Sequence, residues 1–242
     1  MKTPSDIPAI ILAGGQGTRL RSVVADVPKP MAPILDLPFL HYIFLFLKKN
    51  NVKKVVLAVG YKHEIIQDFF KDNYEGIAIS YSIEDEPLGT GGAILKAFDC
   101  VENDAFLING DTFFNIDLAK IAVAYSTQNC KMAIALKPMQ KFDRYGIVNM
   151  DENQFVTSFE EKKYCENGLI NAGVYLTNKQ IFSYIFKENI PQKFSFEKEI
   201  LENKKLTNQL TGLVFDNYFI DIGIPEDYAA AQISFKNFDS LS

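Results

Sequence analysis

Residues 12–35 read LAGGQGTRLRSVVADVPKPMAPIL, and this stretch decides the fold of the chain. It begins where an apolar run, residues 7–12, meets a turn with glycines at positions 14, 15 and 17. Glycines let backbone N–H groups approach an anion closely, and Arg19 and Lys29 add fixed positive charge. An apolar strand followed by such a turn predicts a cradle for the phosphates of a nucleoside triphosphate.

Two familiar phosphate-binding motifs do not match this turn. A P-loop requires a lysine directly after its last glycine, whereas Thr18 and Arg19 follow Gly17. A dinucleotide fingerprint requires a third glycine where this chain has Leu20, which disfavours an NAD-dependent oxidoreductase. The bland alternative is an ordinary glycine-rich connection, and the PKP segment at 28–30 makes the stretch more specific than that.

Composition excludes several classes of protein. The chain has 242 residues, 48% of them hydrophobic, which suits one sizeable α/β domain or two small ones. A net charge of −5 without a long basic run argues against a nucleic-acid surface. The three cysteines lack paired spacing, the N-terminal residues do not resemble a signal peptide, and the apolar runs are too short to span a bilayer. We therefore expect a cytoplasmic protein without nucleic-acid or membrane partners.

Strands and helices alternate along the first half of the chain. Apolar or alternating runs predict strands at 7–12, 55–59, 77–83 and 105–109, and longer amphipathic runs predict helices at 38–50, 62–71 and 92–100. This alternation is typical of a parallel sheet with right-handed crossovers. In such folds ligands lie outside the carboxyl ends of the strands, so the turns after Leu12, Ile83 and Asn109 should face one crevice.

The second half reads as a mixed sheet. We expect a helix at 116–125, strands at 131–136, 146–150, 154–159 and 170–176, helices at 179–186 and 196–202, short β segments near 211–222 and a last helix at 225–235. Neither a repeat nor a clear linker interrupts the sequence. The prediction is a single α/β domain, residues 1–242, with a Rossmann-like, doubly wound, mixed sheet.

Two aspartates follow predicted strands in the same local setting. Asp111 closes Asn109-Gly110-Asp111, and Asp221 opens Asp221-Ile222-Gly223. Mg²⁺ is commonly held by one or two carboxylates together with substrate phosphates, so the two aspartates are candidates for one Mg²⁺ site. For either aspartate alone, a turn or helix-cap role is the better interpretation.

These motifs together resemble a known family. GGQGTRL followed by PKP is similar to the sugar-phosphate nucleotidyltransferases, and the resemblance continues to Asp221. Within the family, RLRSVVADVPKPMAPI most resembles the bacterial D-glycero-α-D-manno-heptose 1-phosphate guanylyltransferases. The resemblance implies that a nucleoside triphosphate, GTP in this subgroup, reacts with a sugar 1-phosphate and Mg²⁺ to give a nucleotide sugar and pyrophosphate. It also implies an N-terminal nucleotide-binding half, about 1–112, and a C-terminal sugar-phosphate half, about 113–242.

The family motifs assign roles to residues of this chain. Catalytic positions are Arg19, Lys29 and Lys162, and metal-binding positions are Asp111 and Asp221. Nucleotide-binding positions are Leu12, Ala13, Gly14, Gly15, Gly17, Thr18, Glu84, Gly89, Thr90 and Asp111. Sugar-phosphate-binding positions are Gly146, Glu161, Lys162 and Asn171.

Three assignments keep an alternative. Glu84 stands where some members place a base-reading glutamine, and a carboxylate suits the two N–H donors of guanine, but residues 84–86 also read as a solvated acidic turn. Lys162 lacks the proline that often follows it in the family, so Lys163 is a rival for the sugar phosphate. The stretch EEKK at 160–163 alone would read as a charged surface hairpin.

A histidine and two phenylalanines fall outside these motifs, and other functions remain as alternatives. His41 opens a predicted helix and reads as structural, while Phe194 and Phe196 flank a serine in a predicted loop and could line a pocket. Rival functions are a uridylyl-, thymidylyl- or mannose-1-phosphate guanylyltransferase, and an inactive subunit that senses sugar nucleotides. The joint presence of Arg19, Lys29 and Asp111 with the later motifs argues against the inactive subunit.

Overall fold

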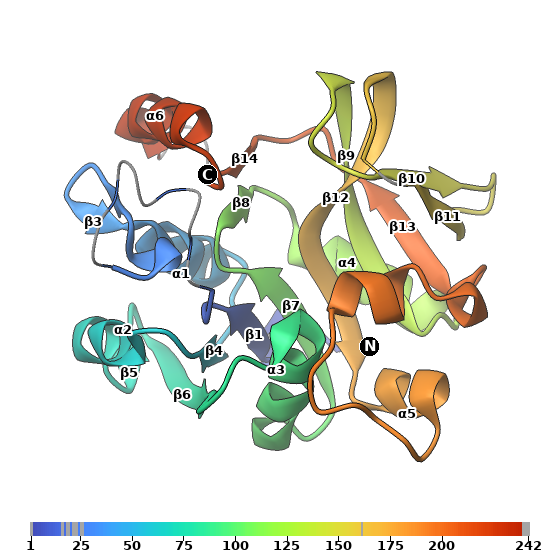
Figure 1. The fold of residues 1–242 in the computed structure, drawn as a ribbon, viewed down its shortest axis with the longest axis horizontal. Coiled ribbons are helices and arrows are strands. Elements are labelled where there is room, and N and C mark those ends of the chain that lie inside the picture. Colours follow the sequence, from blue (N-terminus) through green and yellow to red (C-terminus); the bar gives the residue numbers. More distant parts are fainter. Residues whose placement is uncertain are drawn as a thin grey trace.

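A mixed sheet forms the centre of the protein. A computed structural model describes residues 2–15, 17, 20, 24, 27–160 and 162–238. The main sheet runs β11-β10-β12-β7-β1-β4-β6-β5, with β9 paired to β12 and β13 paired to β9 (Figure 1). Its strands are β1 (Ala9–Leu12), β4 (Lys54–Val59), β5 (Asn73–Tyr74), β6 (Ile77–Ile83), β7 (Asp104–Asn109), β9 (Met132–Phe142), β10 (Ile147–Met150), β11 (Val156–Glu160), β12 (Cys165–Asn178) and β13 (Leu210–Val214).

Longer helices, several three-residue 3-10 turns and two small strand pairs surround the main sheet. The pairs are β2 (Pro33–Ile34) with β3 (Leu37–Pro38) and β8 (Thr112–Phe114) with β14 (Phe219–Asp221). The helices are α1 (Phe39–Lys49), α2 (His63–Phe70), α3 (Gly89–Ala97), α4 (Leu118–Thr127), α5 (Gln180–Phe186), the π-helix η5 (Glu197–Leu201) and α6 (Pro225–Ser234). None of these described helices is long and apolar enough to cross a membrane.

The first half of the chain builds the predicted parallel sheet. β1 pairs in parallel with both β4 and β7, and β4 pairs in parallel with β6. The chain therefore leaves β1 in one direction along the sheet, to β4 and β6, and returns to its other side with β7. Such a reversal of strand order opens a crevice at the carboxyl ends of the two central strands, here after Leu12 and Asn109.

Helices cover both faces of this sheet, as predicted for a doubly wound fold. Successive residues of a strand point to opposite faces, so Ile11 and Leu57 join one buried cluster while Ile10 and Val56 join the other. The first cluster contains residues of α1, α2 and α4, and the second contains residues of α3, α5 and the π-helix η5. Both faces of the central strand β1 are therefore dry, which explains why its residues, Ala9–Leu12, are all apolar.

The second half extends the same sheet through antiparallel pairs, apart from β13, which pairs in parallel with β9. β12 pairs with β7 on one side and with β9 along most of its length on the other. β9 and β12 are longer than predicted, and β9 continues through Pro138. Pro138 is tolerated because the pairing of β9 with β13 ends at Leu136, which leaves that edge of β9 free of a described neighbour.

Several element bounds differ from the prediction for local reasons. α1 begins at Phe39, because Pro38 belongs to the small strand β3. α3 begins at Gly89, three residues before the predicted start. Its first turn was not predicted because it contains three glycines, which are poor helix formers. The segment predicted as a helix at 196–202 forms a π-helix over Glu197–Leu201.

The glycines at the start of α3 allow another part of the chain to approach closely. The Gly91 N–H donates to the Phe194 carbonyl at 2.9 Å, and a Cβ on Gly91 would collide with the Phe194 ring. Gly91→Ala should therefore lower the free energy of unfolding by about 1–3 kcal/mol, as overpacking does, in urea unfolding. Gly60→Ala is the control, since its added Cβ would meet Glu84 at an ordinary 3.6 Å. Equal stability of the two variants would contradict this packing.

Candidate active site

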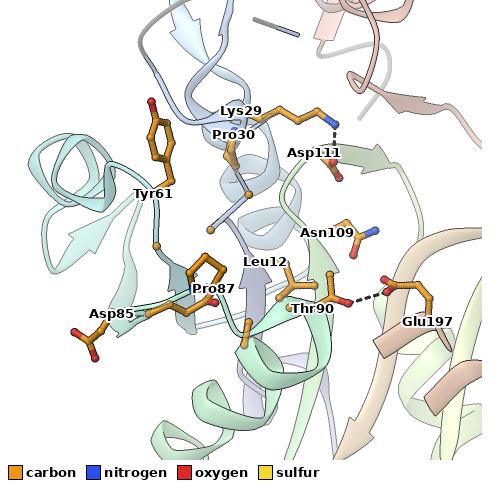
Figure 2. Close-up of a pocket in the computed structure, with 16 residues that line it drawn as sticks. Leu12, Lys29, Pro30, Tyr61, Asp85, Pro87, Thr90, Asn109, Asp111 and Glu197 are labelled. Atoms are coloured by element: carbon orange, nitrogen blue, oxygen red, sulfur yellow. Dashed lines mark hydrogen bonds and ion pairs between the residues drawn. The ribbon is translucent and has the colours of Figure 1, made fainter. Parts of the chain in front are cut away.

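A cavity of about 690 Å³ opens at the carboxyl ends of β1, β6 and β7 (Figure 2). We call it the glycine-loop pocket. Many of the residues predicted to bind nucleotide line it together with the predicted catalytic residue Lys29, although all of these come from four separate segments of the chain. They are Leu12, Gly14, Gly15, Lys29, Glu84, Gly89, Thr90 and Asp111.

A second cavity, of about 470 Å³, lies against the antiparallel half of the sheet, and we call it the hairpin pocket. The predicted sugar-phosphate residues that the structure describes all line it. They are Gly146, Lys162 and Asn171. Asn109, Asp111 and Glu197 line both cavities, so the two pockets meet at these residues. Two ligands bound in the two pockets would therefore touch beside Asp111.

The glycine loop follows β1 directly. Its residues Thr18 and Arg19 lie outside the described residues, so their predicted roles stay predictions. Ala13 is fully buried and its N–H donates to the Ala58 carbonyl at 2.8 Å, so Ala13 fixes the start of the loop. Gly17 has a φ of +59°, and a Cβ there would come within 2.7 Å of the Lys29 Cβ. Glycine at this position thus lets the loop lie against Lys29.

Lys29 stands between the two predicted metal-binding aspartates. Its Nζ lies 2.6 Å from Asp111 Oδ2 and 3.6 Å from Asp221 Oδ1, and its side chain is only 9% exposed. Figure 2 shows the ammonium group reaching toward Asp111 from the turn that carries Pro30. The prolines on both sides of Lys29 fix the backbone from which it extends. Sequence positions 29, 111 and 221 therefore form one charged cluster.

The strand pair β8–β14 brings the two carboxylates together. Asp221 pairs with Thr112, the neighbour of Asp111, and the Ile222 N–H donates to the Asp111 carbonyl at 3.0 Å. Burial and the nearby Asp111 charge raise the pKa of Asp221, while Lys29 and a hydrogen bond from the Gly223 N–H oppose that rise. Two carboxylates that already share one ammonium ion suit a divalent cation with phosphate ligands. Among the described residues, no group of three or more His, Cys, Asp or Glu side chains forms a more complete metal site.

Glu84 lies at the carboxyl end of β6 with its carboxylate half-buried in the glycine-loop pocket. Its Oε2 accepts a hydrogen bond from the Leu88 N–H at 2.9 Å, and its Oε1 lies beside the Gly14 backbone. Burial raises the pKa of the Glu84 carboxyl above its ordinary value, and the Leu88 N–H partly opposes the rise. These contacts distinguish Glu84 from a solvated acidic turn, because they hold its carboxylate in the pocket.

The two rival lysines of the hairpin pocket have different surroundings. Lys162 lines the pocket, whereas Lys163 Nζ lies 2.6 Å from Glu160 Oε2 in an exposed ion pair. Glu161, predicted to accept sugar hydroxyls, lies outside the described residues. The geometry therefore favours Lys162 over Lys163 as the lysine that faces a ligand.

Asn171 lies on β12 at the floor of the hairpin pocket. Its Nδ2 donates to the Tyr175 hydroxyl at 2.7 Å, and its Oδ1 accepts from the Gly173 N–H at 3.0 Å. These two bonds fix the amide where the pairing of β12 with β9 is interrupted, between Asn171 and Tyr175. Among the described residues only the Tyr175 hydroxyl accepts from Nδ2, which leaves its second proton for a ligand oxygen.

The predictions about His41 and about the pair Phe194 and Phe196 have clear outcomes, and one site residue was not predicted. The suggestion that Phe194 and Phe196 line a pocket is wrong, because both rings are buried in the second core cluster and only Ser195 between them borders a cavity. His41 is structural as predicted: it is buried in α1 and forms a 2.9 Å hydrogen bond with the Tyr74 hydroxyl. Glu197 was missed, since nothing in the local sequence SFEKE marks its position beside both pockets.

Comparison with known proteins agrees with this geometry. The profile of the family described as "Nucleotidyl transferase" matches residues 8–237. The chain belongs to this nucleotidyl transferase family. Among curated nucleotidyl transferases, it is 55% identical to the D-glycero-α-D-manno-heptose 1-phosphate guanylyltransferase of Campylobacter jejuni, over 91% of this chain and 96% of that protein. It is 50% identical to the protein of the same name from Aneurinibacillus thermoaerophilus, over 95% of this chain and 99% of that protein.

Solved nucleotidyl transferase structures share the fold. HddC from Yersinia pseudotuberculosis, crystallised with GMP-PN, is 38% identical and superposes with a TM-score of 0.82, covering 95% of this chain and 99% of that one. The predicted doubly wound, mixed-sheet fold and the predicted family are therefore both confirmed. Membership of the nucleotidyl transferase family also excludes the NAD-dependent oxidoreductase considered from the glycine-rich turn.

Proposed function

We propose that this nucleotidyl transferase joins GMP from GTP to D-glycero-α-D-manno-heptose 1-phosphate and releases pyrophosphate. The observation that carries the proposal is the meeting of two pockets beside the cluster of Lys29, Asp111 and Asp221. One pocket has the size and glycine loop suited to a nucleotide, and the other holds the predicted sugar-phosphate residues. The two curated relatives at 55% and 50% identity carry this activity in their names, which supports the choice of both substrates.

The chemistry follows from the charges of the two substrates. An oxygen of the sugar phosphate attacks the α-phosphorus of GTP in line with the bond to pyrophosphate, so that one P–O bond forms as another breaks. The attacking oxygen is already anionic, so a protein nucleophile and a general base are unnecessary. What the protein must supply is alignment of two anions and neutralisation of their charge.

Positive groups around the meeting point supply that neutralisation. We assign Lys29 to the α-phosphate region, Lys162 to the sugar phosphate and, from the sequence, Arg19 with the loop N–H groups to the leaving pyrophosphate. Asp111 and Asp221 would hold Mg²⁺, which when bound would act as a Lewis acid toward the phosphate oxygens. Lys29 can then exchange its ion pair with these aspartates for one with a phosphate.

Direct transfer has a stereochemical test. The enzyme should convert GTP and the heptose phosphate to GDP-heptose, identified by mass spectrometry, with pyrophosphate as the second product. With a chiral α-thio-GTP, phosphorus-31 NMR of the product should show inversion at the α-phosphorus, as one displacement requires. Retention would indicate a covalent protein intermediate and would overturn the mechanism, whereas the absence of GDP-heptose would overturn the choice of substrates.

Glu84 is our candidate for reading guanine. Its ionised carboxylate would accept hydrogen bonds from N1–H and N2–H₂ of the base, and its protonated form loses acceptor capacity. Because burial raises the pKa of Glu84, the protonated fraction grows as the pH falls toward and through that raised value. The KM for GTP should therefore rise as the pH falls from neutral, and stay level above the pKa.

Comparison with Glu84→Gln isolates this effect, because titration of the GTP phosphates is common to both enzymes. At neutral pH the variant should have a KM for GTP about tenfold higher than that of the wild type, because it lacks one charge-assisted hydrogen bond to the base. The ratio of the two KM values should approach one in acid. A ratio that is constant across the pH range would contradict the base-reading role.

A further inference from the structure

The segment that follows α5 places a carboxylate where the two pockets meet. Glu197 begins the π-helix η5, and its side chain lines both the glycine-loop pocket and the hairpin pocket. In Figure 2 it extends toward Thr90 from the side of the pocket that also holds Asn109. π-helical turns are rare and are frequent at functional sites, because they redirect a side chain within a helix.

One oxygen of this carboxylate is held by two hydroxyl groups. Thr90 Oγ1 and Ser195 Oγ each donate to Glu197 Oε2 at 2.7 Å. Thr90 Oγ1 is itself fixed, since it accepts a hydrogen bond from the Phe196 N–H at 2.8 Å. The carboxylate is thus oriented in advance, by groups of both α3 and its own segment.

The other oxygen has no such partner. No group of the described residues donates a hydrogen bond to Glu197 Oε1, and no ion pair among them neutralises the charge. A carboxylate accepts hydrogen bonds and donates none when ionised, so its ligand must be a donor. The phosphates of both substrates are anions that it would repel, and the N–H donors of guanine are assigned to Glu84, so the hydroxyl groups of the two sugars are the donors that remain.

Its surroundings favour the sugar over the ribose. Four other residues of the same segment, Ser195, Lys198, Leu201 and Glu202, line the hairpin pocket only. Burial raises the pKa of the Tyr175 phenol, and the charge of Glu197 contributes to that rise, so the carboxylate lies near the Tyr175–Asn171 hydrogen bond. Asn171 is the residue already expected to contact the sugar.

We propose that Glu197 is a specificity-determining residue that accepts a hydrogen bond from a hydroxyl group of the acceptor sugar, through Oε1. The inference rests on the proposed function and adds a residue to its sugar site. Thr90 and Ser195 are positioning residues that hold the carboxylate. Thr90 lines the glycine-loop pocket, where the nucleotide is proposed to bind. Its hydroxyl group, by donating to Glu197 Oε2, therefore connects the nucleotide site with the sugar site.

Calorimetric titration of the protein with GDP-heptose and with GDP separates the sugar contribution from the nucleotide contribution. The wild-type protein should bind GDP-heptose more tightly than GDP. Glu197→Ala should weaken GDP-heptose binding about tenfold to a hundredfold, as expected for a lost charge-assisted hydrogen bond, and leave GDP binding within about twofold. Glu197→Gln keeps the shape and an acceptor for Thr90 and Ser195, and should weaken GDP-heptose binding by about tenfold because it removes the charge.

Glu199→Gln is the matched control. Glu199 lies in the same π-helix and accepts a hydrogen bond from the Ser195 N–H at 2.9 Å, but it lines neither pocket. This variant should bind both ligands as the wild type does. A Glu197→Ala protein that binds both ligands as the wild type does would overturn the inference, and so would an equal loss for GDP and GDP-heptose, which would place the carboxylate on the ribose. Equal wild-type affinity for the two ligands would instead overturn the proposed sugar and the inference together.

Discussion

Lys29→Met is expected to lower kcat by about a hundredfold or more while the protein stays folded. The Lys29 ammonium is the cation beside both Asp111 and Asp221 at the junction of the two pockets, 2.6 and 3.6 Å from their oxygens. Removing one preorganised electrostatic donor from an active site costs about 10²–10³ in kcat. Methionine keeps most of the apolar stem, so the loss should report the missing charge. Pyrophosphate release at saturating substrates measures it.

Two further variants sharpen this result. Lys29→Arg should also be impaired, because Nζ lies close to the Gly223 backbone and a planar guanidinium needs more room than an ammonium group. Lys163→Met should retain wild-type turnover, since Lys163 itself lines neither pocket and its ammonium group is engaged in an exposed ion pair with Glu160. Near-normal turnover in a folded Lys29→Met protein would remove Lys29 from the catalytic residues.

Asp111→Asn is expected to cost about 10³-fold in kcat and to raise the Mg²⁺ concentration needed for half-maximal rate. Asp111 lines both pockets and shares Lys29 with Asp221, so in the proposed mechanism its carboxylate would help to hold Mg²⁺ beside the substrate phosphates. Lewis-acid stabilisation of phosphate charge is worth several kcal/mol, and each 1.36 kcal/mol corresponds to about tenfold in rate. Initial rates measured against free Mg²⁺ test both parts of the prediction.

The control for Asp111→Asn comes from the same pocket. Asp85 also lines the glycine-loop pocket, but its side chain is 94% exposed and its nearest cation is Lys96 at 3.7 Å. Asp85→Asn should therefore leave kcat and the Mg²⁺ response unchanged. If Asp111→Asn kept the wild-type rate and Mg²⁺ response, the metal would have to be held by other groups.

The strands of the parallel half could be predicted because each one is marked by a run of apolar or alternating residues within its own segment. β6 has the predicted bounds, Ile77–Ile83, and the strand ends at Leu12 and Asn109 lie where the apolar runs stop. The antiparallel half was predicted less well, since the full length of β9 and β12 depends on their mutual pairing. A proline normally ends a strand, so Pro138 suggested that β9 stops before it. The structure tolerates Pro138 within β9 because β13 ends at Val214 and no longer pairs with β9 there.

The site divides in the same way. The places of Glu84 and Asp111 in the glycine-loop pocket could be predicted because a turn at a strand end points into the crevice, whereas their roles rest on the family resemblance. The ion pairs of Lys29 with Asp111 and Asp221 connect positions up to 192 residues apart, and the motifs suggested only that they share a site. Glu197 was out of reach of local patterns, because it enters the site through the packing of residues 192–196 on α3.

The central claim is guanylyl transfer to a heptose phosphate, and the rate of pyrophosphate release tests it most directly. In the presence of Mg²⁺, we would measure the rate of pyrophosphate release from GTP, UTP, dTTP, CTP and ATP, pairing each nucleotide in turn with heptose, mannose and glucose 1-phosphate. We predict that kcat/KM is highest for GTP with D-glycero-α-D-manno-heptose 1-phosphate, and at least about tenfold above every other pair. Preference for another pair, or release with none of them by the folded protein, would contradict the claim.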